Sequence, residues 1–272
     1  MLKKVMHLGI SLGLGASVLL ASSAQAQDSE RLQAAINGEH RQAANVERDV
    51  YRNPYETLSF MRMEPHYTVV ELYPGGGWYT EILAPYLRDS GQLIAAIYPR
   101  SEEDGASAFM VNMGDRYEAF LAEHPDVYDQ VEMREIAPGQ RASLAEPGSV
   151  DMLVDFRNAH NWIGWGAEEM LSSWHEALKV GGLVGIVDHR MDRDMEEGNG
   201  YIHESTLIDV MAANGFVLVD RSEVNANPAD TKDHPGGVWN LPPNLRDVPE
   251  DQIQHYRDIG ESDRLTMLFR KK

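Results

Sequence analysis

The pattern of hydrophobic positions along the chain changes near residue 67. Before it, apolar residues recur at helical spacing, with Leu32, Ala35 and Ile36 on one face, and Pro54 suits the first turn of a further helix that Asn53 caps. Beyond it, short apolar runs alternate with helical patterns. The pattern predicts strands at residues 68–72, 93–98, 131–136, 150–156, 183–187, 216–220 and 264–269, and helices at 78–87, 115–123, 168–178 and 204–214.

Strands that alternate with helices predict an α/β fold, a doubly wound and mostly parallel sheet with helices on both faces. Gly181 and Gly215 each follow a predicted helix and are expected to cap it. No internal repeat and no change of composition divide the chain, so we expect one domain at residues 67–272 with an N-terminal helical extension at 27–66.

A long loop rich in Pro, Gly and Asn occupies residues 225–244. Loops of this length in compact domains are typically lids, binding loops or disordered segments. As a lid over a bound acceptor, this loop would present Asn227, Asp230, Lys232, Asp233, His234 and Trp239. An ordered surface loop packed by its prolines is the alternative.

The first 26 residues have the pattern of a secretory signal peptide. Lys3 and Lys4 precede an apolar stretch at 5–21, and the sequence AQA at 24–26 is a small-x-small cleavage site. We expect cleavage after this site, a periplasmic mature protein and no stable membrane insertion. A transmembrane anchor is the alternative, which the short and glycine-rich apolar stretch disfavours.

Composition and charge narrow the classes of partner. The formal net charge of -19 would repel the phosphates of nucleic acids and anionic membranes, so we expect neither as a partner. A hydrophobic content of 43% and a charged content of 25% are ordinary for a globular protein. The expected partner is a small molecule, and the oligomeric state stays open.

Candidate chemistry begins with YPGGGWYT, residues 73–80, directly after the first predicted strand. Ligands of doubly wound sheets lie outside the carboxyl ends of the strands, and glycines there let the backbone approach them. Gly75, Gly76 and Gly77 do not fit the GxGxxG spacing of dinucleotide-binding loops, and no Walker-type Gly-Lys-Ser/Thr occurs here. A tight turn that binds nothing is the alternative.

The loop resembles the acid-x-G-x-G-x-G motif of class I S-adenosylmethionine-dependent methyltransferases. Glu71 takes the position of the acid, Gly75 and Gly77 those of the second and third glycines, and Tyr73 replaces the first glycine. Further stretches resemble the same proteins: GSVDMLVDFRNAHNW, ALKVGGLVGIVDHR, AANGFVLVDRSEV, NPADTKDHP and ESDRLTMLF. Together they make the mature chain similar to a family of predicted exported bacterial methyltransferases.

This resemblance implies a seven-stranded Rossmann-like methyltransferase sheet with an antiparallel last strand. It also implies methyl transfer from S-adenosylmethionine to a small acceptor, with Glu71 and the loop from Tyr73 to Gly77 contacting the cofactor. The chain departs from the family pattern at two strand ends. Ile97-Tyr98 stands where an acid normally binds the cofactor ribose, and Ala137-Pro138 offers no acid to the adenine. Glu102 and Glu103, on the next loop, are candidate substitutes for the ribose acid.

Polar residues follow the fourth and fifth predicted strands, and we expect them to point into the crevice at the carboxyl edge: Asp155, Arg157, Asn158, His160, Asn161, Trp162, Asp188, His189 and Arg190. His160 and His189 are candidate general bases or acceptor contacts, because imidazole titrates near neutral pH. Asn158 and Asp155 are expected to fix the acceptor or the methionine end of the cofactor. For each of them, a structural hydrogen bond at a strand end is the alternative.

Two further groups of residues have competing interpretations. A metal site could use Asp155, His160, Asp188, His189 and His203, but no spacing such as H-E-x-x-H supports it, so we expect no metal. Arg52 is expected to form a surface ion pair with Glu47, Asp49 or Glu56 rather than to face the site.

The sequence thus predicts a methyltransferase, with a second hypothesis beside it. In the second, an exported protein of this fold binds another small molecule without methyl transfer. The missing ribose acid at Ile97-Tyr98 motivates that alternative.

Overall fold

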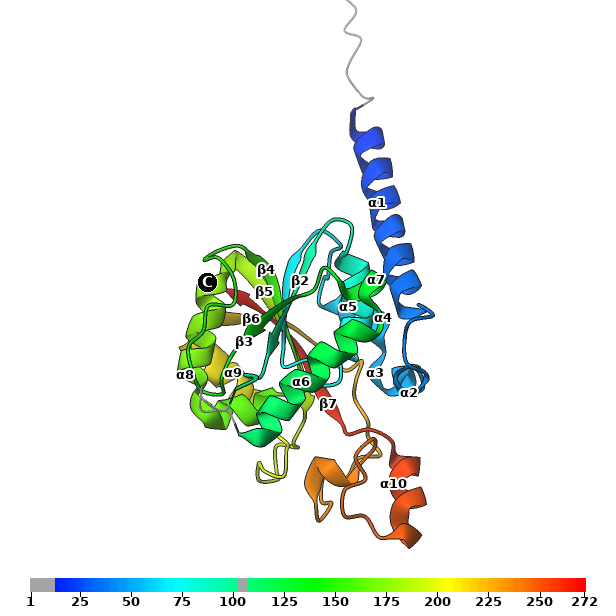
Figure 1. Ribbon diagram of the computed structural model, residues 1–272, viewed down its shortest axis with the longest axis vertical. Coiled ribbons are helices and arrows are strands. Elements are labelled where there is room, and N and C mark those ends of the chain that lie inside the picture. The colour runs from blue at the N-terminus through cyan, green and yellow to red at the C-terminus, as the bar shows by residue number, and fades with distance from the viewer. Residues whose placement is uncertain (1–12, 102–106) are drawn as a thin grey trace, which may run out of the picture.

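The computed structural model describes residues 13–101 and 107–272 (Figure 1). Lys3 and Lys4 of the predicted signal peptide, and Glu102 and Glu103, lie outside the described residues. The strands are β1 Thr68–Leu72, β2 Gln92–Ile97, β3 Glu132–Glu135, β4 Val150–Phe156, β5 Leu178–His189, β6 Phe216–Ser222 and β7 Arg264–Lys271. The α-helices are α1 Gly13–Ile36, α2 Ala43–Val46, α3 Asp49–Arg52, α4 Pro54–Phe60, α5 Thr80–Leu87, α6 Ala108–Glu123, α7 Pro125–Tyr128, α8 Ala159–Ala177, α9 Glu204–Ala213 and α10 Ile253–Ile259.

The strands form one seven-stranded sheet in the order β3-β2-β1-β4-β5-β7-β6. The strands from β1 to β5 pair in parallel, and β7 runs antiparallel to β5 and β6. This confirms the predicted α/β sheet and its antiparallel last strand. Leu72 is in register with Ala96 on one side and Asp155 on the other, so the carboxyl ends of β1, β2 and β4 lie at one edge.

Two hydrophobic cores cover the two faces of the sheet, because side chains alternate along each strand. On one face, Val70 and Leu72 pack with the tryptophans of α8 and the apolar side of α9. On the other face, Val69 packs with α1, α4, α5 and α6. Figure 1 shows α8 and α9 on one side of the sheet and α1, α4 and α5 on the other.

Two local expectations are wrong, and a third holds only in part. Gly181 does not cap a helix, because α8 ends at Ala177 and Gly181 lies within β5. The helix α8 begins at Ala159, well before the predicted start, and Gly166 interrupts it at φ 121°. Asn53 is the N-cap residue of α4, as predicted, although its side chain makes no capping hydrogen bond and donates instead to the Val224 carbonyl at 2.8 Å.

The helix α1 runs through the predicted cleavage site without interruption. Among its described side chains, the buried ones are Leu32, Ala35 and Ile36, all beyond that site. They pack against the α5 side of the sheet. Within the described ranges, no helix combines the length and apolar character needed to cross a membrane.

Candidate functional site

The loop from Tyr73 to Gly77 joins β1 to α5 at the carboxyl edge of the sheet. Gly75 and Gly77 have φ values of +61° and +82°, which glycine adopts at little cost. A Cβ on Gly77 would lie 2.4 Å from the Phe120 ring, whereas a Cβ on Gly75 or Gly76 would meet no atom within 4 Å. Gly77 therefore serves packing, and the backbone at Gly75 and Gly76 is open.

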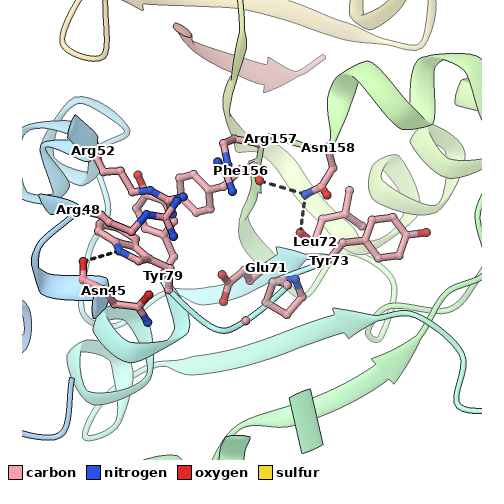
Figure 2. Close-up of a pocket in the computed structure, with 14 residues that line it drawn as sticks. Asn45, Arg48, Arg52, Glu71, Leu72, Tyr73, Tyr79, Phe156, Arg157 and Asn158 are labelled. Carbon is pink, nitrogen blue, oxygen red and sulfur yellow. Dashed lines mark hydrogen bonds between the residues drawn. The ribbon is translucent and has the colours of Figure 1, made fainter. Parts of the chain in front are cut away.

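A cavity of about 170 Å³ lies beside this open backbone (Figure 2). Its walls come from the β1 loop, the end of β4 and the N-terminal helices. The lining residues are Asn45, Arg48, Arg52, Glu71, Leu72, Tyr73, Pro74, Gly75, Gly76, Trp78, Tyr79, Phe156, Arg157 and Asn158. The cavity is therefore lined by Glu71, Asn158 and the predicted loop residues from Tyr73 to Gly76, whereas the predicted Gly77 is not among its lining residues.

Glu71 lies at the end of β1 and is 1% exposed. Its carboxyl accepts a hydrogen bond from the Thr80 hydroxyl at 2.7 Å, and that hydroxyl also lies 3.0 Å from the Tyr117 hydroxyl. Burial raises the pKa of Glu71 to about 7, and the Thr80 hydrogen bond opposes this shift. Glu71 can therefore be protonated or ionised near neutral pH.

Tyr73 adopts φ 42° at the position of the missing glycine. Its ring stacks on the Tyr98 ring, with 4.1 Å between centroids, and its hydroxyl donates to the Ile136 carbonyl at 3.2 Å. The Trp165 ring contacts Tyr73 edge-on. Aromatic rings thus lie at the ends of β1 and β2, where Tyr98 stands in place of the expected ribose acid.

The predicted residues Asp155 and Asn158 contact each other at the end of β4. Asn158 Nδ2 donates to Asp155 at 2.8 Å and to the Leu72 carbonyl at 3.2 Å, which fixes it against β1. The second oxygen of Asp155 accepts from the Trp162 indole at 2.7 Å. Burial, and then the Asp188 charge, raise the pKa of Asp155 to about 7. Asn158 lines the cavity, whereas Asp155 lies behind it and orients Asn158.

His160 and His189 lie together, with ring centroids 5.2 Å apart. Asp188 accepts from the backbone N–H groups of both, at 2.8 and 2.7 Å, and its carboxylate pairs with His160 Nδ1 at 2.9 Å. The Nδ1 atom of His189 is 2.5 Å from the Ser262 hydroxyl. The structure therefore brings the two predicted histidines together through Asp188, but neither is among the residues that line the cavity.

The two histidines differ in protonation. Burial lowers the pKa of His160, but Asp188 more than compensates, so the pKa lies above its ordinary value. Burial, and then His160, lower the pKa of His189 well below its ordinary value, so this ring is neutral at neutral pH. Ligand atoms of His160, Asp188 and His189 lie within 4.8 Å of one another, a spacing that a metal ion could use.

A cluster of arginines lies at the site, and of its members the sequence placed only Arg157 at the crevice. Glu261, between α10 and β7, accepts from Arg48 Nε at 2.6 Å, Arg52 Nε at 3.3 Å and Arg264 Nη1 at 3.1 Å. Arg157 Nη1 lies 4.0 Å from the same carboxylate. The expected surface ion pair of Arg52 is wrong, because this residue is 4% exposed and lines the cavity.

The loop at 225–244 holds a network of its own rather than covering the cavity. Asp230 accepts from the Tyr201 hydroxyl at 3.0 Å and from the Asp263 backbone N–H at 2.8 Å, and it pairs with His234 at 2.9 Å. Lys232 pairs with Asp263 at 3.0 Å. Asn227 donates to the Glu261 carbonyl at 2.7 Å. None of the predicted lid residues lines the cavity, and the loop supports the Glu261 segment from outside.

Comparison with known proteins adds the fold family. No protein-family model and no curated protein matches the sequence. A SAM-dependent methyltransferase from Aquifex aeolicus superposes with a TM-score of 0.52 at 16% identity, covering 66% of this chain and 87% of its own. The chain has the class I methyltransferase fold. A geranyl diphosphate methyltransferase in complex with SAM superposes with a TM-score of 0.51 at 15% identity. The alignment covers 88% of this chain and 95% of that chain.

A third similar structure is a complex with ligands. The geranyl diphosphate C-methyltransferase from Streptomyces coelicolor A3(2), in complex with Mg²⁺, geranyl diphosphate and S-adenosyl-L-homocysteine, has a TM-score of 0.51 at 15% identity. The alignment covers 88% of this chain and 86% of that chain. At this identity the likeness concerns the fold, so the activity of this chain must be argued from its own residues.

Proposed function

We propose that this protein transfers the methyl group of S-adenosylmethionine to a small acceptor. The observation that carries the proposal is the open backbone of Gly75 and Gly76, which faces a cavity together with Glu71 and Asn158. This cavity lies at the carboxyl edge of the strands, where ligands of doubly wound sheets bind. The methyltransferase fold supports the same reaction class.

The residues present fit the cofactor. Open glycine backbone, the Asn158 amide and the Glu71 carboxyl supply polar atoms for its amino-acid end. On the adenosine side, Tyr73 and Tyr98 offer aromatic faces in place of an acid, and aromatic faces bind flat rings by stacking. When bound, the cofactor would supply an electrophilic methyl group.

The contribution of the protein to such a transfer is mainly positioning. Asn158, held by Asp155 and the Leu72 carbonyl, can orient a polar group in the cavity without moving. We retain His160 and His189 as candidate catalytic residues. The neutral His189 ring suits a proton acceptor, and His160 is held by Asp188.

Titration calorimetry with S-adenosylhomocysteine tests the proposal. Gly76→Leu places a side chain at the cavity, and we expect it to weaken binding by at least about tenfold, or about 1.4 kcal/mol. Gly164→Leu on α8 is the matched control, because a Cβ there also meets no atom within 4 Å. Wild-type protein that binds no S-adenosylhomocysteine at millimolar concentration would overturn the proposal.

A binding protein without methyl transfer is the second candidate. The stack of Tyr73 on Tyr98 favours it, since these rings cover strand ends where the resemblance implies contacts with ribose and adenine. Native mass spectrometry of protein from a cell extract distinguishes the two: a retained small molecule that is not a methionine sulfonium compound supports this second candidate.

We also propose that the first 26 residues direct export to a periplasm, as their signal-peptide pattern suggests. The buried described side chains of α1 all follow the expected cleavage site, so cleavage would leave their packing intact. The test is N-terminal sequencing of the protein from fractionated cells. A full-length N-terminus in the cytoplasmic fraction would contradict this part of the proposal.

A further inference from the structure

The arginine cluster (Arg48, Arg52, Arg157 and Arg264) carries more positive charge than its carboxylate neutralises. Four guanidinium groups face the single carboxylate of Glu261, which leaves an excess of three positive charges. Burial would raise the pKa of Glu261, but the four arginines lower it to about 2, so this carboxylate is fully ionised. Glu261 therefore offsets one of the four positive charges at neutral pH.

Several donors of this cluster have no hydrogen-bond partner among the described residues. The Nη2 atoms of Arg48 and Arg52 are buried and make no hydrogen bond to any described residue. The Arg52 guanidinium lies 4.6 Å from the Trp78 ring centroid. The Arg157 side chain makes no hydrogen bond within the described ranges and is 29% exposed. Unpaired buried donors cost free energy, so a ligand that pairs with them would bind favourably.

These donors share one space. Arg48, Arg52 and Arg157 all line the cavity, and Figure 2 shows Arg48 and Arg52 entering from the N-terminal segment and Arg157 from the end of β4. Burial lowers the pKa of Arg52 well below its ordinary value, and repulsion by the Arg157 charge adds to this shift. Among the residues that line the cavity, Glu71 is the one acid, and its carboxyl already accepts a hydrogen bond from the Thr80 hydroxyl.

We infer that the cavity binds a doubly charged oxyanion group, a phosphate or a pair of carboxylates, carried by the acceptor. Guanidinium forks match the geometry of such oxyanions, and two or more positive charges call for more than one negative charge. The amino-acid end of S-adenosylmethionine does not meet this need, because its ammonium group cancels its carboxylate. The assignment of the oxyanion group to the methyl acceptor rests on the proposed function. The binding of an oxyanion in the cavity does not depend on it.

Inorganic phosphate is the probe, titrated calorimetrically into the full-length protein. Arg157→Gln removes a partly exposed group that makes no described hydrogen bond, so folding should be retained; we expect phosphate affinity to fall about tenfold. Arg134→Gln, on the exposed edge strand β3, is the matched control and should leave affinity unchanged. Glu261→Gln removes the competing carboxylate and should strengthen phosphate binding. Phosphate affinity should also fall as ionic strength rises.

Two results would overturn the inference. One is equal phosphate affinity in the wild type and Arg157→Gln. The other is competition, in which saturating S-adenosylhomocysteine displaces phosphate, because the cofactor would then occupy the oxyanion site. Simultaneous binding supports the assignment to the acceptor. Phosphate binding without any binding of S-adenosylhomocysteine would retain the oxyanion site while refuting the proposed methyl transfer.

Discussion

The ring of Tyr73 stacks on that of Tyr98 with an angle of 12° between their planes, and its hydroxyl donates to the Ile136 carbonyl. These two contacts tie the β1 loop to the ends of β2 and β3. We predict that Tyr73→Phe, which loses the hydrogen bond alone, lowers the free energy of unfolding by about 1 kcal/mol. Tyr73→Gly relieves the positive φ but removes the ring, and should cost about 2–4 kcal/mol. Urea denaturation measures the free energy of unfolding of both variants. Equal losses in Tyr73→Phe and Tyr73→Gly would contradict a contribution from the stacked ring.

Tyr98 should contribute to cofactor binding through its ring rather than its hydroxyl. Its hydroxyl makes no hydrogen bond to the part of the chain that the structure describes, whereas its ring faces the β1 loop. Tyr98→Ala is predicted to weaken S-adenosylhomocysteine binding about tenfold, and Tyr98→Phe to leave it within about twofold. Calorimetry distinguishes them, and a loss in Tyr98→Phe would point to the hydroxyl instead.

Glu71 makes stability depend on pH in a defined direction. Burial raises its folded pKa from 4.5 to about 7, so the folded state holds the proton more tightly than the unfolded state. The resulting destabilisation is absent below about pH 4.5, grows as pH rises, and is complete above about pH 7, at about 3 kcal/mol.

Glu71→Gln removes this titration and keeps an oxygen for Thr80. Its advantage in the free energy of unfolding over the wild type should therefore be largest at pH 8 and shrink towards pH 5. Glu146→Gln, at an exposed position, is the control and should differ little from the wild type throughout. Urea denaturation across this range is the measurement, and an advantage that grows towards acid pH would contradict the buried carboxyl.

Asp230 should hold the loop at 225–244 in place. Its carboxylate accepts from Tyr201, His234 and two backbone N–H groups, so Asp230→Ala leaves several buried donors unpaired. We expect a loss of about 3 kcal/mol or more in unfolding free energy and faster proteolysis within the loop. Asp233→Ala, at an exposed position whose carboxylate accepts from the exposed Thr231 hydroxyl, is the control and should be cleaved at the wild-type rate.

The sheet was predictable because its strands are short apolar runs bounded by polar or turn residues. The predicted bounds of Thr68–Leu72 and Val150–Phe156 match the structure, since both strands are buried on both faces. The start of α8 was missed because Gly164 and Gly166 interrupt its helical pattern. Gly181 was misassigned because a glycine after a helix suits a cap as well as a strand.

The cavity was only half predictable. Gly75, Gly76 and Asn158 follow strand ends, and that position alone places them at the ligand-binding edge. Arg52 was misread because Glu47, Asp49 and Glu56 are near in sequence, whereas its partner Glu261 is 209 residues away. Local charge patterns carry no information about such distant pairs, and only the fold brings them together.

The arginine cluster beside the cavity joins the N-terminal helices to the C-terminal part of the chain. Arg48 and Glu261 are 213 residues apart, and Arg264 reaches back from the first residue of β7 to donate to the Tyr51 carbonyl. A chain still emerging from a ribosome, or threading through a membrane pore, has the arginines of the N-terminal helices without the Glu261 carboxylate that pairs with them. Ligand capture is therefore confined to the finished protein, and the compartment where folding ends decides which small molecules it can meet.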